Sequence, residues 1–275
     1  MSQWWALNHL SLVEVIVVGL LAGGVGVLAT LHRRIFFAEA ISHATFPGAV
    51  LGVVLGAAVA PGYMSLWLFG GALVGCLVLA AAMHFLARVP GLSSQSAAGI
   101  VLSVGFAMGY FWATWFKPLP IRVESFLTGS VLTVNVVDVV ASLSVLGAVL
   151  VLWWALGPAL VSAGFDRASF RATGQGTKVL DALLLGLISA TMVVVIPAMG
   201  TIVAIALVAA PAATLQPFMH RPGQWLLYSA LLGALLGLCG LMLAHVWGLS
   251  AGGLIAVSCG ICYVASSLWA RSRGR

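Results

Sequence analysis

Nine stretches of mostly apolar residues follow one another along the chain, separated by short polar segments. Stretches of about 17 to 25 residues are long enough to cross ~30 Å of hydrocarbon as helices that rise 1.5 Å per residue. The pattern predicts an all-α fold, a polytopic membrane helical bundle in one domain over residues 1–275. The predicted spans are residues 12–30, 38–60, 63–87, 97–116, 135–157, 179–196, 200–216, 225–246 and 250–270.

The sixth and seventh predicted spans are short, and the break between them contains Pro197 and Gly200. An alternative interpretation makes this break a re-entrant turn, which would leave eight spans and move the C-terminus to the other side of the membrane. The first apolar stretch has no lysine-rich start and no small-residue cleavage site, so we expect no removable signal peptide.

Composition and charge agree with a permanent place in a lipid bilayer. The chain is 62% hydrophobic and 7% charged, which excludes a soluble globular protein with a polar surface. If nine spans alternate with the N-terminus outside and the C-terminus in the cytoplasm, every basic residue except Lys117 and Arg122 lies on the cytoplasmic side. The net charge of +6 is thus explained by the orientation of the chain in the membrane. Because the basic residues are scattered over loops, we expect no nucleic-acid partner.

Two connecting segments are longer than the others. Residues 158–178, on the inner side, include an amphipathic stretch over residues 164–174 that is typical of one or two helical turns along the membrane surface. This segment is either a docking surface or an ordinary solvated linker. Residues 117–134, on the outer side, are too polar for a span and too apolar for a free linker, so we expect them to pack into the outer mouth.

A carboxylate and an imidazole lie four residues apart in the second predicted span. Glu39 and His43 would share one helix face, and Pro47 and Gly48 interrupt the backbone one turn later. A charge inside a span is costly and tends to face a cavity, a partner or an ion. The pair is a candidate metal site with Pro47 and Gly48 as gating residues; the competing interpretation is that Glu39 forms an ion pair with the basic residues at 33–34.

The remaining candidate groups favour structural roles. Glu14, Asp138 and Asp181 lie near span ends, where we expect solvated or helix-capping carboxylates. Cys259 and Cys262 lie inside the last span with no further ligand pair, and a structural zinc site needs four ligands. Glycines four residues apart recur within several spans and indicate close helix packing.

The chain carries no ATP-binding or hydrolytic motif. Nothing matches G-x-x-x-x-G-K-[ST], and the nearest string, residues 174–178, has misplaced glycines and no hydroxyl after the lysine. No Gly-x-Ser-x-Gly or His-Glu-x-x-His pattern occurs. We therefore predict a transport protein without catalytic residues or a permanently bound cofactor, and not an enzyme.

Five strings resemble the membrane permeases of zinc, manganese and iron ABC importers, known as the ABC-3 type. Glu39-Ala-Ile-Ser-His-Ala-Thr-Phe-Pro-Gly48 resembles that family's Asp-Ala-(Leu/Ile)-Ser-His-Ala-x-x-Pro-Gly signature. The other strings, which are similar to further motifs of the family in the same order, are Glu124-Ser-Phe-Leu-Thr-Gly-Ser130, Phe165-Asp-Arg-Ala-Ser-Phe-Arg-Ala-Thr-Gly174, Val208-Ala-Ala-Pro-Ala-Ala-Thr214 and Trp247-Gly-Leu-Ser-Ala-Gly-Gly253.

The resemblance implies a type II importer permease that forms a homodimer in the lipid membrane. A separate cytoplasmic ATPase subunit would bind the ATP, and an extracytoplasmic metal-binding protein would deliver a divalent metal, the transported substrate, for alternating access. Two copies would bring two Glu39/His43 pairs together, a ligand set that suits zinc or manganese and does not exclude iron. The residues implied to couple to the ATPase lie in the segment 158–178 and are Phe165, Asp166, Arg167, Ala168, Phe170 and Gly174.

The chain also departs from the family pattern. Glu39 stands where the family has aspartate, Arg167 where an apolar residue or proline is usual, and residues 247–253 lack the family's acid and proline. A metal chelate such as haem or a siderophore is therefore an alternative cargo. A cation-coupled secondary transporter that uses Glu39 and His43 as a proton relay is the alternative from another class.

Overall fold

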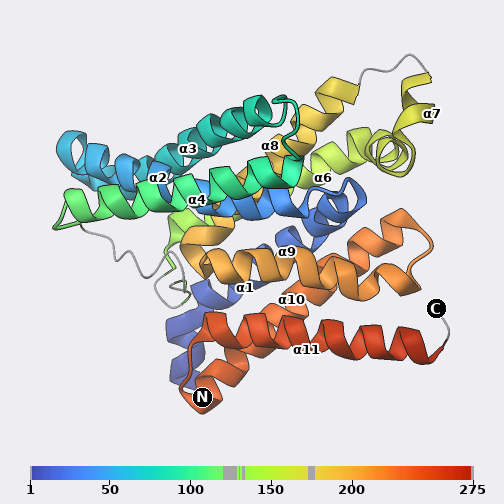
Figure 1. Cartoon of the computed structure of the whole chain (residues 1–275). Helices are drawn as coiled ribbons and strands as arrows, with labels where there is room; N and C mark the ends of the chain where they lie inside the picture. Colours follow the sequence, from blue (N-terminus) through green and yellow to red (C-terminus); the bar gives the residue numbers. More distant parts are fainter. Residues whose placement is uncertain (1, 120–128, 130, 132–133, 173–176, 274–275) are drawn as a thin grey trace.

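The computed structural model describes the chain except residues 1, 120–128, 130, 132–133, 173–176 and 274–275. The described residues form α-helices joined by short turns and two 3₁₀ helices, as the sequence predicts (Figure 1). The elements are α1 (Ser2–Leu31), α2 (Ile35–Val59), η1 (Pro61–Tyr63), α3 (Met64–Leu86), α4 (Ser94–Trp115), α6 (Val136–Phe165), α7 (Arg167–Ala172), α8 (Thr177–Met199), α9 (Thr201–Leu215), η3 (Gln216–Phe218), α10 (Pro222–Trp247) and α11 (Ala251–Ser272).

Within the described residues, nine helical segments are long and apolar enough to cross a membrane. The predicted break at residues 197–200 separates α8 from α9, and Gly200 adopts φ +84° there. Eight of the segments reach 22 residues or more, and the shortest, Thr201–Phe218, has 18. The structure therefore supports nine candidate spans, each with the length that a bilayer requires.

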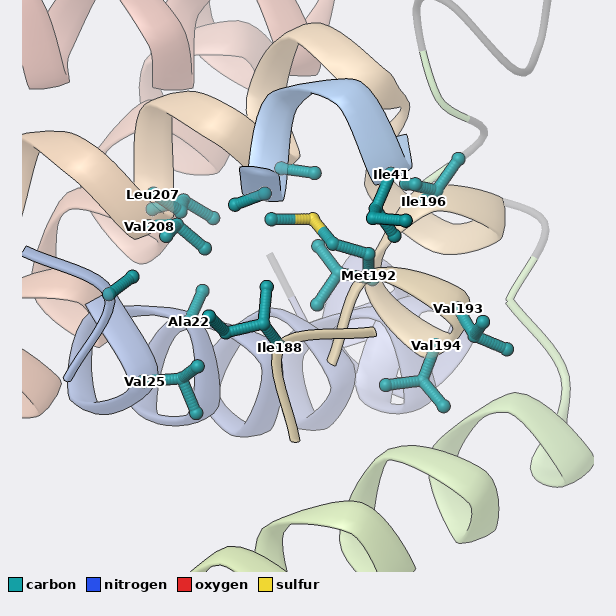
Figure 2. Close-up of a cluster of buried hydrophobic side chains, with 14 of the residues drawn as sticks. Ala22, Val25, Ile41, Ile188, Met192, Val193, Val194, Ile196, Leu207 and Val208 are labelled. Carbon is teal, nitrogen blue, oxygen red and sulfur yellow. The ribbon is translucent and has the colours of Figure 1, made fainter. Parts of the chain in front are cut away.

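The helices form two groups around a shared centre (Figure 1). In one group α2 packs against α3 and α4, and in the other α1 packs against α9 and α10, with α11 against α9 and α10. Helix α8 contacts both groups through α1 and α2. Figure 2 shows the resulting core, in which Ile188 and Met192 of α8 lie among side chains of α1, α2 and α9.

Glycines allow the closest helix contacts. A Cβ added to Gly48 or Gly52 would overlap the backbone of α3, at Gly71 and at Trp67 respectively. A Cβ on Gly19 would lie 2.6 Å from the Cα of Ala234 in α10. The packing role predicted from the glycine spacing is confirmed at Gly19 and Gly52. Gly48, predicted to act in gating, also lies in close contact with α3.

The outer connecting segment approaches the break between α8 and α9. Gly129, its one described residue between positions 120 and 130, has φ +77° and lies against the carbonyl of Met199. A side chain at this position would overlap that carbonyl. Val131, two residues later, is buried. At these two described positions the segment packs into the bundle, as expected.

Helix α6 continues beyond its predicted end at residue 157. It runs to Phe165 with Pro158 inside it, so the first part of the segment 158–178 is helical rather than a loop. Proline is tolerated within membrane helices because neighbouring groups satisfy the backbone acceptor that it leaves free. At 30 residues, or about 45 Å, α6 is longer than the hydrocarbon layer and extends toward α7.

Candidate functional site

Glu39 and His43 both lie on α2, one helical turn apart, and both side chains are half-buried. They are near enough to interact electrostatically. The His43 ring packs edge to face on Phe106 of α4, with 5.5 Å between ring centroids and an angle of 86° between planes. Its Nδ1 is buried and has no hydrogen-bond partner in the described part of the chain. One ring nitrogen of the imidazole is therefore not engaged by any described group.

The backbone of α2 near His43 has unusual hydrogen bonding. Ser42 Oγ donates to the carbonyl of Glu39 at 2.7 Å, and Thr45 Oγ1 donates to the carbonyl of Ser42. Pro47 has no N–H, so it cannot donate to the carbonyl of His43 as an ordinary helical residue would. The carbonyl of His43 therefore lacks its usual helical donor one turn before Pro47.

The competing interpretation of Glu39 as the ion-pair partner of residues 33–34 is not realised in this structure. No ion pair joins Glu39 to Arg33 or Arg34 in the described part of the chain, whereas Arg167 does pair with Asp181. The same residues contain no cluster of three or more His, Cys, Asp or Glu side chains. One copy of the described chain therefore offers a cation two side-chain ligands, fewer than the four of a closed zinc site.

Pro47 and Gly48 line an apolar hollow of about 440 Å³ beside α2. Its other walls come from α3 and from Met108 and Trp112 of α4. The hollow contains no charged lining residue. It provides space next to the turn of α2 that follows the polar pair, the turn at which proline has removed a backbone hydrogen bond.

The predicted coupling residues separate into exposed and internal ones. Phe165 is 67% exposed at the end of α6, and Asp166 and Ala168 are also exposed. The carboxylate of Asp166 accepts a hydrogen bond from the Ala168 N–H at 2.9 Å at the start of α7. Phe170 is buried. Gly174 lies outside the described residues.

Arg167 is engaged within the chain itself. Its guanidinium forms an ion pair with Asp181 of α8. Asp181 is therefore an ion-pair partner of the predicted coupling segment, where the sequence predicted a solvated or helix-capping carboxylate. The pair fixes the short helix α7 to a helix that reaches the core.

The turn before α2 contacts the end of α6. His32 Nε2 donates to the carbonyl oxygen of Leu160 at 2.9 Å. The pKa of His32 lies below its ordinary value of 6.5, chiefly because burial penalises the charged ring, and the nearby Arg167 and Arg34 act in the same direction. A neutral His32 thus links the segment that carries α7 to the start of α2.

Glu14 was expected to be solvated or to cap a helix, and that expectation is wrong. The side chain is fully buried between α1 and α6, where one oxygen accepts a 2.6 Å hydrogen bond from Ser142 Oγ. The other oxygen has no partner among the described residues. Asp138, in contrast, caps α6 by accepting from the Asn135 N–H at 2.9 Å, as expected.

The cysteines behave as small packing residues. All four thiols are free, and Cys76 and Cys259 are buried. No described residue completes a metal cluster with Cys259 and Cys262. The burial of Cys76 and Cys259 agrees with the interpretation of the cysteines as helix-packing residues.

Within the part of the chain that the structure describes, nine helices long and apolar enough to cross a membrane, a Glu–His pair inside one of them and the short helix α7 paired to α8 are typical of a membrane transport subunit. The chain belongs to the ABC 3 transport family, whose model matches residues 7–270. The family assignment from the sequence motifs is confirmed.

Curated relatives extend over nearly the same length. The manganese transport system membrane protein MntC of Halalkalibacterium halodurans is 26% identical over 261 residues, which cover 94% of this chain and 84% of the relative. The zinc transport system membrane protein TroC of Treponema pallidum is 30% identical over 247 residues, 87% of this chain and 80% of the relative.

Two solved structures share the fold. PsaBC from Streptococcus pneumoniae, in complex with Fab, aligns with a TM-score of 0.83 and 27% identity over 93% of this chain and 89% of that one. An inward-facing putative metal-chelate type ABC transporter aligns with a TM-score of 0.74 and 15% identity over 94% of this chain and 84% of the other. The second likeness concerns the fold alone.

Proposed function

We propose that this chain is the permease subunit of a binding-protein-dependent ABC importer that moves a divalent transition metal, zinc or manganese, into the cytoplasm. The observation that carries the proposal is the Glu39/His43 pair on the proline-interrupted helix α2, with a buried His43 Nδ1 that has no partner in the described chain. Relatives named for manganese and for zinc transport support a metal of this class.

The ligand chemistry suits a metal that must be released. One carboxylate and one imidazole are an oxygen and a nitrogen ligand, which zinc and manganese both accept. One copy supplies one such pair from its described residues. A homodimer would bring two pairs to a shared path, and incomplete coordination by either copy alone would keep binding transient.

The ATPase subunit would act on the permease through α7. The exposed Phe165, Asp166 and Ala168 would contact a separate cytoplasmic ATPase subunit, which binds the ATP because this chain has no P-loop. The Arg167–Asp181 ion pair would pass the movement to α8, and the His32–Leu160 hydrogen bond would pass it to the turn before α2. Bending of α2 at Pro47 and Gly48 would then open or close the path.

The orientation follows from the loop charges, with the N-terminus outside and the C-terminus in the cytoplasm of a plasma-membrane protein. In this orientation the Gly129 contact with Met199 lies at the outer side. An extracytoplasmic metal-binding protein would deliver the ion there, next to the break between α8 and α9.

Uptake of zinc, manganese and iron tracers, with haem for comparison, tests the proposal in cells that also express the ATPase and the binding protein. We expect one metal to accumulate, and Glu39→Gln and His43→Gln to abolish accumulation at equal membrane abundance. His84→Gln is the matched control, because His84 lies at the end of α3 and bonds to Arg88 at the surface.

Three outcomes would contradict the proposal. Unchanged uptake in both site variants would exclude Glu39 and His43 from the transport path, and accumulation of haem alone would exclude a free metal as cargo. Uptake that needs no ATPase subunit would indicate a secondary transporter.

A further inference from the structure

A second cavity lies at the end of the bundle that carries α7 and the C-terminus. Its volume is about 350 Å³, and its walls come from the α1–α2 turn, the end of α6 and the connection between α9 and α10. Figure 1 shows these segments at the same end of the molecule. The polar side chains that line it are Thr30, Arg33, Gln216, His220 and Arg221.

The charge of this cavity has one sign. Arg33 and Arg221 line it together with His220, and no carboxylate is among the lining residues. Neither arginine forms an ion pair with any described residue, and both side chains are exposed. Two guanidinium groups without counter-charges in a concave surface attract an anion, and the planar guanidinium suits the oxygen atoms of a phosphate.

Arg33 occupies a backbone position that ordinarily favours glycine. It is the one non-glycine residue in the described chain with positive φ, at +56°, in the turn that ends α1. The Arg33 N–H donates to the carbonyl of Thr30, and the Arg34 N–H donates to that of Ala29 at 2.7 Å. Glycine would adopt this backbone conformation at lower energy. The presence of arginine is therefore better explained by a binding role of its guanidinium than by local folding.

The opposite wall is fixed in place. Trp225 is buried, and its Nε1 donates to the carbonyl of Ala212 at 2.9 Å, which ties the start of α10 to α9. Phe218 packs on Trp269 with 5.0 Å between ring centroids, and the Arg273 guanidinium lies 4.1 Å from the centre of the Trp269 ring. Trp225 thus fixes one wall of the cavity, and aromatic and basic side chains of the kind that mark a membrane surface lie nearby on η3 and α11.

The geometry points to a binding site for the phosphate of an anionic lipid headgroup, held by Arg33 and Arg221. The lining includes the residues at which α1 ends and α10 begins, so the cavity lies at the depth of the headgroups. Basic pockets between membrane helices on the cytoplasmic side are typical sites for such lipids. The assignment uses the proposed orientation of the bundle and is independent of the metal pair.

Such a lipid would sit beside the coupling segment. Gly164 and Phe165, the last residues of α6 before α7 begins, also line the cavity. A bound headgroup would bridge the α1–α2 turn and the α9–α10 connection next to this segment. Anionic lipid should therefore stabilise the permease more than zwitterionic lipid does.

The test uses the full-length permease in neutral detergent, titrated with phosphatidylglycerol or phosphatidylcholine and followed by native mass spectrometry and thermal unfolding. We expect phosphatidylglycerol to bind more tightly, and Arg33→Gly and Arg221→Gln each to weaken it about fivefold. Arg33→Gly relieves the positive φ, so its unfolding temperature without lipid should be unchanged or higher. Arg271→Gln, an exposed basic residue at the same end outside the cavity, is the control and should leave binding unchanged.

Three results would overturn the assignment. Equal binding of the two lipids, or full binding by the Arg33→Gly, Arg221→Gln double variant, would show that the arginines do not hold the headgroup. Equal stabilisation by soluble glycerol 3-phosphate at matched concentration would assign the cavity to a free phosphate. If the arginine variants no longer co-purify with the ATPase subunit but still bind lipid, the cavity is a contact site for protein and not for lipid. None of these results depends on metal uptake.

Discussion

His32 and Leu160 are joined by a 2.9 Å hydrogen bond that connects the turn before α2 to the last turns of α6. Gly164 reinforces the contact, because a Cβ there would lie 2.6 Å from Leu31 Cγ and 3.1 Å from His32 Nε2. Since α6 leads directly into α7, this contact links the coupling segment to the turn before the helix that carries Glu39 and His43. Burial of the His32 ring at this position lowers its pKa.

We expect the permease to lose stability as pH falls below about 6.5, in part through His32. Its pKa in the folded chain is lowered from 6.5, so the unfolded chain binds a proton in this range that the folded chain does not. Burial is the main cause of the lowered pKa, and Arg167 and Arg34 act in the same direction. The hydrogen bond to Leu160 and the charge of Asp181 oppose them. Thermal unfolding at pH 7.5 and 5.5 should show a smaller drop for His32→Gln than for the wild type. An equal drop would mean that His32 does not contribute.

The Arg167–Asp181 ion pair should matter for coupling more than for stability. The two side chains are 40% and 26% exposed, so solvent screening limits the pair to at most about 1 kcal/mol. Asp181→Asn should therefore shift unfolding little but reduce substrate-stimulated ATPase activity of the assembled transporter. The exchange Arg167→Asp with Asp181→Arg should restore part of that activity. A large fall in unfolding temperature without a change in coupling would contradict this role.

Two neighbouring glycines on facing helices should respond oppositely to alanine. A Cβ at Gly52 would overlap the carbonyl of Trp67, whereas a Cβ at Gly70 would meet nothing within 4 Å. Gly52→Ala should destabilise by about 1–3 kcal/mol through overpacking, and Gly70→Ala should be neutral or stabilising by up to about 1 kcal/mol. Unfolding in detergent at a series of temperatures compares the two. Similar effects would mean that α2 and α3 are not in close contact.

The spans could be predicted from the sequence because lipid leaves few solutions. A long apolar stretch in hydrocarbon must satisfy its own backbone, and a helix does so. The glycine spacing also predicted close packing, but it could not say which helices meet, since partners such as Gly52 and Trp67 are fixed by the whole bundle. The end of α6 was misplaced: the predicted span stops at residue 157, whereas the helix continues through Pro158 to Phe165.

The site was predicted in part. Glu39 and His43 share one helix, so their spacing alone places them on one face. The ring of Phe106 and the Asp181 partner of Arg167 come from other helices, and nothing local signals them. Glu14 was misjudged for the same reason, because its hydrogen-bond donor Ser142 lies 128 residues away in the sequence.

Glu14 and Ser142 should contribute to stability as a pair. Ser142→Ala would leave both carboxyl oxygens of the buried Glu14 without a described partner, which costs about 1–3 kcal/mol. Glu14→Gln keeps an acceptor oxygen for Ser142 and should cost less. A double-mutant cycle with Ser142→Ala and Glu14→Gln, measured by thermal unfolding, gives the coupling between them. Additive effects would show that the hydrogen bond adds nothing.

Phe106 should orient His43 toward the transported ion. The edge-to-face contact at 5.5 Å restrains the imidazole, and such contacts contribute about 0.5–1.5 kcal/mol beyond simple burial. Phe106→Leu keeps an apolar side chain but removes the ring, so we expect a higher KM for metal uptake, by about threefold to tenfold, at nearly unchanged maximal rate. Phe111→Leu, an exposed aromatic on the same helix, is the control. A lower maximal rate with an unchanged KM would place the effect of Phe106 in movement of the bundle and not in positioning His43.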